Sequence, residues 1–383
     1  MTPNARVAAA IEVLDAILAG QPAEQALLRW SRGARYAGSG DRSAVRDLVF
    51  DSLRRLRSRA ALGGAMTGRG LMLGALRESG TDPAAVFTGQ GHDPAPTGPA
   101  DPDGAAPSGA EAADLPDWIL PLWRDSLGAD ADRIAALMRD RAPVWLRVNT
   151  ARSDPVTVRA LLAAEGILTA PSTDLPTALR VTEGERRVAA SAPYAQGLVE
   201  LQDLSPQLAC AALPLAAGDR VLDYCAGGGG KALALAARAP VEITAHDADP
   251  ARMRDLPARA ARAGVRIRTS AQPQGRFDLV VADVPCSGSG TWRRTPDQKW
   301  RLTPQELDRL VALQAEILDR AAGFVAPGGH LAHMTCSLLK AENEDQIARF
   351  LNRNPRFAQV SARRFTPLDA GDGFFLSLLG RAE

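Results

Sequence analysis

Apolar side chains recur at helical spacing near the start of the chain. Four of them lie three or four positions apart: Val7, Ile11, Leu14 and Leu18. This spacing predicts an amphipathic helix. Further helices are predicted over residues 24–30 and 43–56, the last with Asp41 as its N-cap. Residues 1–80 are therefore expected to form an all-helical domain.

The periodic pattern stops after residue 80 and returns at Leu115. Residues 81–113 contain six prolines, many glycines and alanines, and almost no large apolar side chains. Such a segment buries too little apolar surface to offset the entropy lost on ordering it. Residues 81–114 are therefore predicted to be a disordered acidic linker.

Residues 115–200 show a mixed pattern. Helices are predicted near 117–140 and at 155–165, with a strand at 144–148 and further strands near 179–200. This alternation indicates a small α/β domain.

From residue 201 onward, short apolar runs alternate with helix-like stretches. Strands are predicted over 221–223, 242–245, 279–282 and 330–334, and helices over 232–238, about 250–262 and about 304–322. Alternating strands and helices favour a parallel sheet. Ligands of such sheets bind beyond the carboxyl ends of the strands.

Composition and charge narrow the class of protein. The 383 residues are 46% hydrophobic and 23% charged, which is typical of a folded chain of several domains. No apolar stretch reaches the roughly 18–20 residues of a membrane span. Arg6, Glu12 and Asp15 interrupt the apolar N-terminus, which argues against a signal peptide. The four cysteines form no CxxC pair, so a cytoplasmic protein with reduced thiols is predicted.

Three groups of reactive side chains follow predicted strand ends: Asp223 with Cys225, Asp283 with Cys286, and Cys336. The first group opens a loop of four glycines that ends at Lys231, and Asp247 lies twenty residues after Gly227. Glycines admit a ligand close to the backbone, and an acid at this distance can bind ribose hydroxyls. A nucleotide-like cofactor is predicted, although the same letters also fit a dinucleotide fingerprint or a tight turn.

The two cysteine loops indicate thiol chemistry. A thiolate that adds to carbon 6 of a pyrimidine makes carbon 5 nucleophilic enough to take a methyl group, and a neighbouring acid can stabilise the ring. A second cysteine can then assist release. The alternative is that each cysteine is a small buried hydrophobe, as is expected for Cys210 in its apolar helix.

A basic stretch bracketed by tryptophans follows the first cysteine loop, over residues 291–300. Arg293, Arg294 and Lys299 are predicted to contact RNA phosphates, with tryptophan stacking on a base. The alternative is a solvated loop whose tryptophans lie in the core. A second basic segment, residues 252–268, is interpreted as a solvated helix face rather than an RNA site.

These motifs resemble the RNA cytosine-C5 methyltransferases of the RsmB/Sun family. The resemblance rests on the Asp223–Lys231, Asp283–Thr291 and Thr335–Ser337 blocks. Further matches are Arg293–Trp300, Glu342–Gln346, Asp372–Phe375, Trp145–Asn149 and Leu201–Asp203. It covers about residues 115–383, and residues 1–75 look like the NusB-like helical domain that bacterial members carry.

The resemblance implies roles for individual residues. Cys336 would be the nucleophile, Cys286 the release cysteine, and Asp283 the contact to base and cofactor. S-adenosyl-L-methionine would be bound by Asp283, by Asp247 and by the loop Cys225, Ala226, Gly227, Gly228, Gly229, Gly230 and Lys231, with Lys231 donating to the acid. Two features depart from the family. Gly227 and Gly228 stand where it has Ala and Pro, and residues 266–274 lack its acid, for which only Ser270 could substitute.

The resulting hypothesis is an α/β protein with a Rossmann-like class I methyltransferase domain over residues 201–383. A small α/β RNA-binding domain at 115–200 and a helical NusB-like domain at 1–80 would precede it. The expected activity is methylation of cytosine carbon 5 in RNA, 16S ribosomal RNA by similarity, by a monomer without membrane contact. The alternatives are a non-catalytic RNA-binding assembly factor and an NAD-dependent oxidoreductase. The first hypothesis requires the sulfurs of Cys286 and Cys336 to converge beside the glycine loop.

Overall fold

The computed structural model describes residues 1–383, which divide into two compact units. The first comprises residues 1–141 with 292–302, and the second comprises residues 142–291 with 303–383. These units do not follow the predicted boundaries at residues 115 and 201. The helices predicted near 117–140 belong to the first unit, together with a short piece of chain from the methyltransferase-like half.

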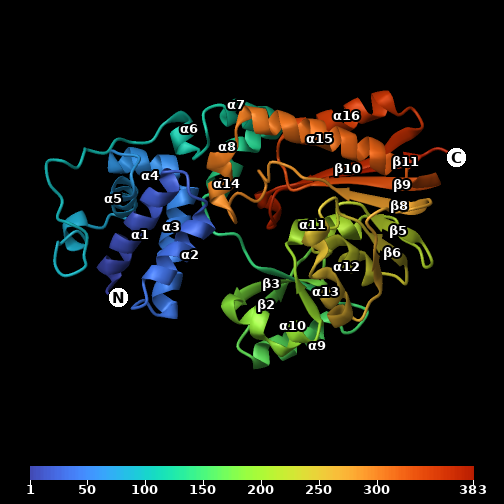
Figure 1. The fold of residues 1–383 in the computed structure, drawn as a ribbon, viewed down its shortest axis with the longest axis horizontal. Helices are drawn as coiled ribbons and strands as arrows, with labels where there is room; N and C mark the ends of the chain where they lie inside the picture. Colours follow the sequence, from blue (N-terminus) through green and yellow to red (C-terminus); the bar gives the residue numbers. More distant parts are fainter. The chain divides into compact units, whose positions relative to one another are not determined.

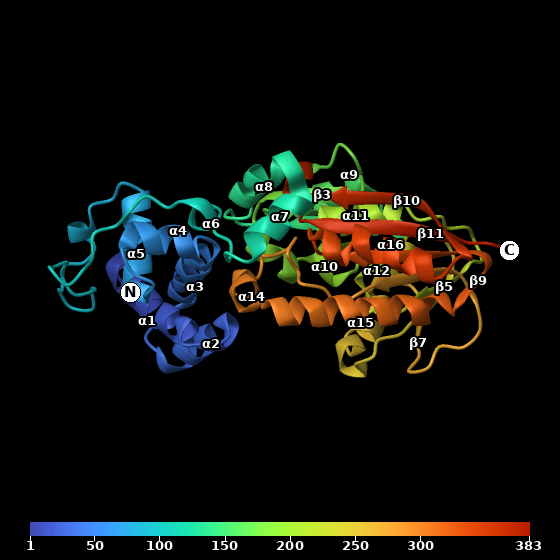
Figure 2. The same cartoon turned by 90° about the horizontal axis from the view of Figure 1, so that it is seen from above.

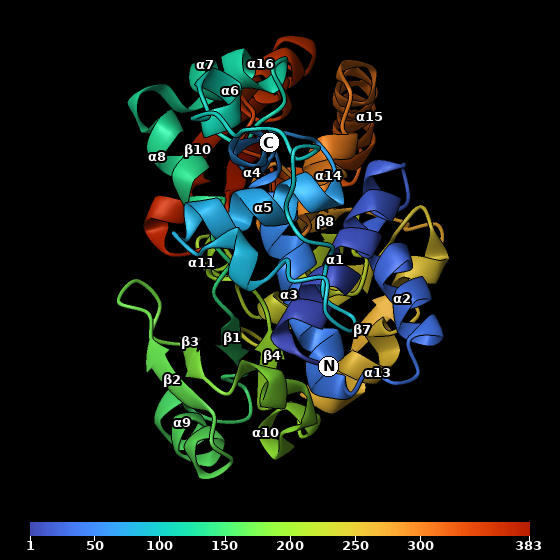
Figure 3. The ribbon, with the colours of Figure 1, turned by 90° about the vertical axis from the view of Figure 1, so that its left-hand side faces the viewer.

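The first unit begins with five helices (Figures 1 and 3). They are α1 (Pro3–Leu18), α2 (Ala23–Gly33), α3 (Ser39–Arg54), α4 (Leu56–Gly63) and α5 (Gly68–Glu78). Their apolar faces bury Leu14, Val49 and Leu71 in one core, which confirms the helical prediction. Asp41 is not the N-cap of α3. Gly38 is the N-cap residue, and Asp41 lies in the first turn of the helix. The Gly38 N–H donates to the Asp41 carboxylate at 3.0 Å.

The segment 81–114 differs from the predicted disordered linker. It holds a 3-10 turn, η1 (Pro83–Ala85), and the short helix α6 (Gly109–Ala112). Phe87 is buried beneath the Arg69 guanidinium, whose carbon lies 4.7 Å from the ring centroid. Arg69 also forms an ion pair with Asp101 and donates to the carbonyls of Ala95 and Pro96. The contacts of Arg69 therefore hold residues 81–114 in a defined conformation, although the low apolar content of this segment predicts disorder.

Three further helices complete the first unit: α7 (Ile119–Leu127), α8 (Ala131–Leu137) and α14 (Pro296–Arg301), with η2 (Gly128–Asp130) between the first two. The ring of Trp123 stacks on that of Trp292, with centroids 6.0 Å apart. Trp300 Nε1 donates to the Leu53 carbonyl at 2.7 Å. The 292–302 segment is therefore anchored to α7 by the buried Trp292 and to α3 by the partly buried Trp300.

The second unit contains two sheets. The smaller has the order β2-β3-β1-β4 and is antiparallel throughout: β1 (Trp145–Val148), β2 (Leu168–Pro171), β3 (Ala178–Glu183) and β4 (Val199–Leu201). The helices α9 (Pro155–Ala164) and α10 (Ala192–Ala195) and the 3-10 turn η3 (Glu185–Ala190) accompany it. The predicted strands and the helix at 155–165 are confirmed, and β2 is an additional exposed edge strand.

The larger sheet has seven strands in the order β10-β11-β9-β8-β5-β6-β7. They are β5 (Arg220–Asp223), β6 (Glu242–Ala245), β7 (Ile267–Thr269), β8 (Phe277–Asp283), β9 (Val325–Thr335), β10 (Phe357–Phe365) and β11 (Phe374–Arg381). The strands β5 to β9 are parallel, as predicted. β11 runs antiparallel to both of its neighbours, so the sheet is mixed rather than purely parallel.

Helices cover both faces of this sheet (Figure 2). α11 (Leu204–Ala211) and α12 (Gly230–Ala236) share a core with Val221 and Ile243, while α13 (Leu256–Ala263), which follows η4 (Pro250–Met253), contributes Leu256 beside Ala245. α15 (Pro304–Ala322) and α16 (Glu344–Arg353), with η5 (Lys340–Glu342) before α16, share the opposite core with Leu222 and Val280. A last 3-10 turn, η6 (Pro367–Asp369), links β10 to β11.

Two points correct or extend the expectation for this unit. Arg266 precedes β7 and Arg268 lies within it, so the basic segment 252–268 is not one continuous helix face. No helix of the structure is long and apolar enough to cross a membrane.

Candidate active site

The two cysteine loops meet at the carboxyl ends of adjacent parallel strands. Asp283 at the end of β8 pairs with Met334 near the end of β9, so the chain segments that follow emerge side by side. The Sγ atoms of Cys286 and Cys336 lie 3.4 Å apart, and both side chains are partly exposed. The two sulfurs therefore converge, as the hypothesis from the sequence requires. Cys210 is buried in the core formed with α11, and burial raises the pKa of its thiol to about 11.

The two thiols differ in acidity. The hydrogen bond from Cys286, together with the Lys231 ammonium, lowers the pKa of Cys336. The same hydrogen bond, with burial and the Glu342 carboxylate, raises the pKa of Cys286. The thiolate is the nucleophilic form of cysteine. The arrangement therefore favours a thiolate on Cys336 with a protonated Cys286 beside it.

Lys231 joins the glycine loop to the cysteine site. Its Nζ donates to Asp283, and it lies 5.4 Å from the centroid of the Phe374 ring. Burial opposes the charge, but the adjoining Asp283 carboxylate outweighs it and raises the pKa of Lys231. Lys231 is therefore a fixed cation between Asp283 and Cys336. This confirms the predicted donation from Lys231 to the acid.

A buried carboxylate holds both cysteine loops together. Glu342 is fully buried and accepts hydrogen bonds from Ser287 N at 2.8 Å, Ser287 Oγ at 2.5 Å, Ser337 Oγ at 2.5 Å and Gln314 Nε2 at 3.0 Å. Ser287 follows Cys286, and Ser337 follows Cys336. One side chain thus fixes the residue next to each sulfur, and no role for Glu342 was predicted, although it opens the matched Glu342–Gln346 block.

The glycine loop has a defined conformation. Gly227 and Gly229 have φ values of +49° and +80°, the left-handed region that favours glycine. Gly227 N donates to Asp247 Oδ2 at 2.9 Å. The carbonyls of Gly228 and Gly230 accept from Arg259 and Arg147, respectively. Four consecutive glycines are therefore held by three charged side chains.

Two of these charged side chains come from outside the predicted site. Arg147 lies on β1 and is buried, and burial lowers the pKa of its guanidinium to about 10. Arg259 lies on α13 and also forms an ion pair with Glu200 of β4. Arg147 lies in the matched Trp145–Asn149 block and Arg259 in the basic segment 252–268, but their contacts with the loop form only in the fold.

The residues beyond the carboxyl end of β5 fit a cofactor with a cationic amino group. Asp223 is buried, one of its oxygens accepts from Ala232 N at 3.1 Å, and Oδ1 has no partner. Burial raises the pKa of Asp223 to about 7. Asp247, in contrast, binds Gly227 N, Asp249 N and Arg252. An ammonium at Asp223 Oδ1 would satisfy the one unpaired carboxylate oxygen of this loop.

The predicted RNA contacts are mostly buried. Arg293 and Lys299 are 5% and 2% exposed, and Trp292 is stacked in the core of the first unit. Arg293 O accepts from Arg54 at 2.7 Å, and Lys299 Nζ donates to Arg54 O at 3.4 Å. Only Arg294 of the three predicted residues is exposed. Trp292 lies in the core, as the alternative predicts, but the segment is not a solvated loop, and the burial of Arg293 and Lys299 does not support their contact with phosphates.

Comparisons with known proteins agree with this geometry. The family model of the 16S rRNA methyltransferase RsmB/F matches residues 210–379, and that of the ferredoxin-like domain of RsmF/B-like methyltransferases matches residues 115–188. The ribosomal RNA small subunit methyltransferase B of Xanthomonas campestris pv. campestris is 37% identical over 301 residues, which span 72% of this chain and 69% of that protein. The Vibrio cholerae protein of the same name is 34% identical over 70% of this chain and 65% of its own length.

Solved structures show the same fold. The crystal structure of PH0851 superposes with a TM-score of 0.76 at 22% identity and covers 99% of both chains. A methyltransferase homologue from Pyrococcus horikoshii superposes with a TM-score of 0.63 at 23% identity, covering 71% of this chain and 97% of its own. These likenesses confirm the expected Rossmann-like methyltransferase fold.

Proposed function

Because the chain belongs to the RsmB/F family of methyltransferases, we propose that it methylates carbon 5 of a cytosine in small-subunit ribosomal RNA. The curated relatives carry small-subunit ribosomal RNA in their names, and the chain spans about two thirds of their length. S-adenosylmethionine is the cofactor. The observation that carries the cytosine assignment is the pair of sulfurs 3.4 Å apart beside the Lys231–Asp283 ion pair.

The side chains divide the reaction between them. The Cys336 thiolate forms a bond to carbon 6 of the cytosine, and the electron pair of the 5,6 double bond moves to carbon 5. A proton passed from the Lys231 ammonium through Asp283 to nitrogen 3 would neutralise the negative charge that the ring gains. When bound, S-adenosylmethionine supplies the electrophilic methyl group that carbon 5 takes. A base then removes the carbon 5 proton, the double bond re-forms, and the bond to Cys336 breaks with assistance from Cys286.

Two cysteine variants test this proposal. Cys336→Ala should abolish methyl transfer to small-subunit RNA, because the neighbouring Cys286, whose pKa is raised, stays a protonated thiol. Cys286→Ala should instead accumulate a covalent protein–RNA adduct, detectable as a shifted band on a denaturing gel. Normal turnover by Cys336→Ala would overturn the assignment of the nucleophile. Bisulfite sequencing of ribosomal RNA from cells lacking the protein would identify the cytosine.

A second candidate function is a non-catalytic RNA-binding assembly factor. It is favoured by Gly227 and Gly228 in place of the family's Ala and Pro, and by the absence of an acid from residues 266–274. Isothermal titration with S-adenosylmethionine separates the two functions. The absence of binding at millimolar cofactor would favour the assembly factor.

A further inference from the structure

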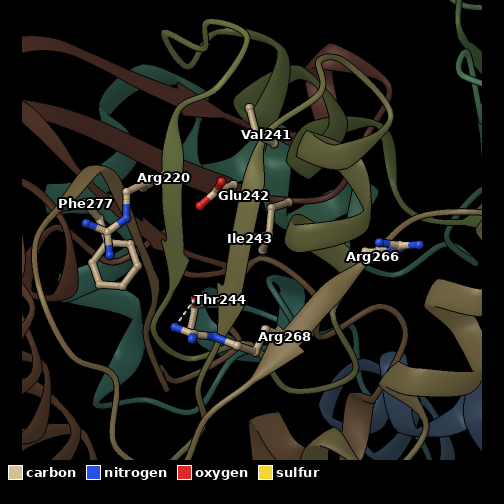
Figure 4. A pocket seen from close by; sticks show the side chains of 8 residues that line it. All are labelled: Arg220, Val241, Glu242, Ile243, Thr244, Arg266, Arg268 and Phe277. Atoms are coloured by element: carbon tan, nitrogen blue, oxygen red, sulfur yellow. Dashed lines mark hydrogen bonds between the residues drawn. The ribbon is translucent and has the colours of Figure 1, made fainter.

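Part of the large sheet lacks a covering helix on the face that carries α15. The connection from β7 to β8, residues 270–276, contains no helix, and a concavity of about 450 Å³ lies over the starts of β5, β6 and β8 and along β7 (Figure 4). Ile243 and Ala245 of β6 are buried in cores on the α12 and α13 face. Because side chains alternate along a strand, Glu242 and Thr244 point to the open face.

The charged side chains that line this face are predominantly basic, beside the apolar Val241, Ile243 and Phe277. Arg220, Arg266 and Arg268 contribute three guanidinium groups, and Glu242 is the one carboxylate among the lining residues. A face that normally packs against a helix would carry apolar side chains here. The composition therefore indicates a surface that meets water or a charged ligand.

None of the three arginines takes part in an ion pair within 4 Å. Arg268 Nη2 donates to Thr244 Oγ1 at 3.3 Å, as the dashed line in Figure 4 shows, and the Arg220 guanidinium carbon lies 5.2 Å from the centroid of the Phe277 ring. These contacts orient two guanidiniums but leave their charge uncompensated. Arg259 and Arg262, in contrast, are both neutralised by Glu200.

We propose that this arginine surface, formed by Arg220, Arg266 and Arg268, binds phosphates of the RNA backbone. Guanidinium groups match phosphate oxygens with paired hydrogen bonds, and phosphate contacts position an RNA without reading its sequence. The surface offers no free aromatic ring for a base, since Phe277 is 1% exposed and lies under Arg220. That favours a phosphate chain over a single nucleotide as the occupant.

The surface lies at the opposite strand ends from the cysteines. β5, β6 and β8 begin at Arg220, Glu242 and Phe277, whereas Cys286 and Cys336 follow the carboxyl ends of β8 and β9. An RNA that reaches both places extends well beyond its target cytosine. This inference rests on the proposed function, because it assumes an RNA substrate, and it assigns the surface a role in holding the RNA rather than in methyl transfer.

The test measures RNA binding and methyl transfer separately. The variant Arg266→Gln/Arg268→Gln is compared with Arg309→Gln/Arg320→Gln, a control that removes the same charge from exposed positions of α15. Binding of a fluorescent fragment of small-subunit ribosomal RNA is followed by anisotropy over a range of salt concentrations. We expect the first variant alone to lose about tenfold in affinity, with a slope of log K against log salt shallower by about 1–2. Arg266→Lys/Arg268→Lys should retain most of the affinity.

The outcomes separate the inference from the function on which it rests. Equal affinity and equal salt slope in all variants, while the wild-type protein methylates the RNA, would overturn the arginine surface alone. Wild-type protein that binds the RNA through these arginines without methylating it would overturn the proposed function and leave the surface standing. If inorganic phosphate binds to these arginines but none of the substitutions changes the affinity for RNA, the surface is a small-anion site and the inference is overturned. Unchanged thermal unfolding midpoints verify that each variant is folded.

Discussion

At the scale of single residues, Glu342 is the side chain on which the two cysteine loops most depend. Its carboxylate accepts four hydrogen bonds, and charge-assisted bonds of this kind each contribute about 1.5–3 kcal/mol. Glu342→Gln keeps the shape but replaces one acceptor oxygen with a donor group. We expect kcat to fall at least tenfold, because both loops shift, while the affinity for RNA changes little.

The same substitution removes a negative charge that raises the pKa of Cys286. Alkylation of Cys286 by iodoacetamide, measured against pH by peptide mass spectrometry, should therefore move to lower pH in Glu342→Gln. Glu344→Gln, an exposed position two residues away that pairs with Arg364, is the matched control and should leave both measurements unchanged. An unchanged kcat in Glu342→Gln would show that the loops hold their positions without this carboxylate.

The raised pKa of Asp223 predicts that the affinity for the cofactor depends on pH. Its pKa is raised to about 7, above the ordinary value of 3.8, so the carboxylate is mostly protonated below pH 6 and mostly ionised above pH 8. An ammonium binds the ionised form, so binding should release a proton and strengthen as pH rises through 7. The affinity for S-adenosylhomocysteine should increase about tenfold from pH 6 to pH 8 by calorimetry. Asp223→Asn should bind more weakly, with a flat pH profile; a sloping profile in that variant would assign the titration to another group.

At the scale of elements, α13 and β4 control the glycine loop through Arg259. Its guanidinium binds both the Gly228 carbonyl and Glu200, whereas Arg262 binds Glu200 without touching the loop. Removing one such hydrogen bond costs about 1 kcal/mol, or about fivefold in affinity. Arg259→Ala should therefore weaken S-adenosylhomocysteine binding about fivefold, and Arg262→Ala should not. Equal losses in both variants would point to Glu200 rather than to the loop carbonyl.

The helix α14 carries the one buried lysine that the sequence assigned to RNA. Burial lowers the pKa of Lys299 to about 8 from the ordinary 10.5, so the folded protein binds fewer protons than the unfolded chain between these values. Its stability should therefore rise with pH from 8 to 10.5. Lys299 also donates to the Arg54 carbonyl and faces the buried Asp114 carboxylate, so Lys299→Met should lower the free energy of unfolding at pH 7 by about 1–3 kcal/mol in urea titrations. Its RNA affinity should stay within twofold of wild type; a tenfold loss would restore Lys299 as a phosphate contact.

Which elements the sequence predicts depends on how much apolar surface they bury. The strand 242–245 and the helix 304–322 are predicted to the residue, because each buries a regular apolar face. β2, β7, β10 and β11 were not predicted. The first three are edge strands that are largely exposed and carry no apolar alternation, whereas β11 is buried but is a mostly continuous apolar run without a period of two. The cysteines and the glycine loop are local motifs and were found, whereas Arg147, Arg259 and Glu342 reach the site only through long-range packing.

At the scale of the whole molecule, the first unit is discontinuous, which changes what a truncated chain should do. The sequence predicts a helical domain that ends near residue 80, but Lys299 and Trp300 donate to carbonyls of α3, and Arg54 donates to Arg293. A chain of residues 81–383 would leave these polar groups and the tryptophan ring without partners. Unsatisfied buried groups cost about 1–3 kcal/mol each, so residues 296–302 should detach, while Trp292 keeps its stack on Trp123.

Limited trypsin digestion measures that detachment at Lys299, which is 2% exposed in the full chain. We expect cleavage after Lys299 to accelerate at least tenfold in the 81–383 chain, while cleavage after the exposed Arg309 stays constant. Equal cleavage rates at Lys299 in both chains would show that the segment holds its place without the first 80 residues, as a separable N-terminal domain requires.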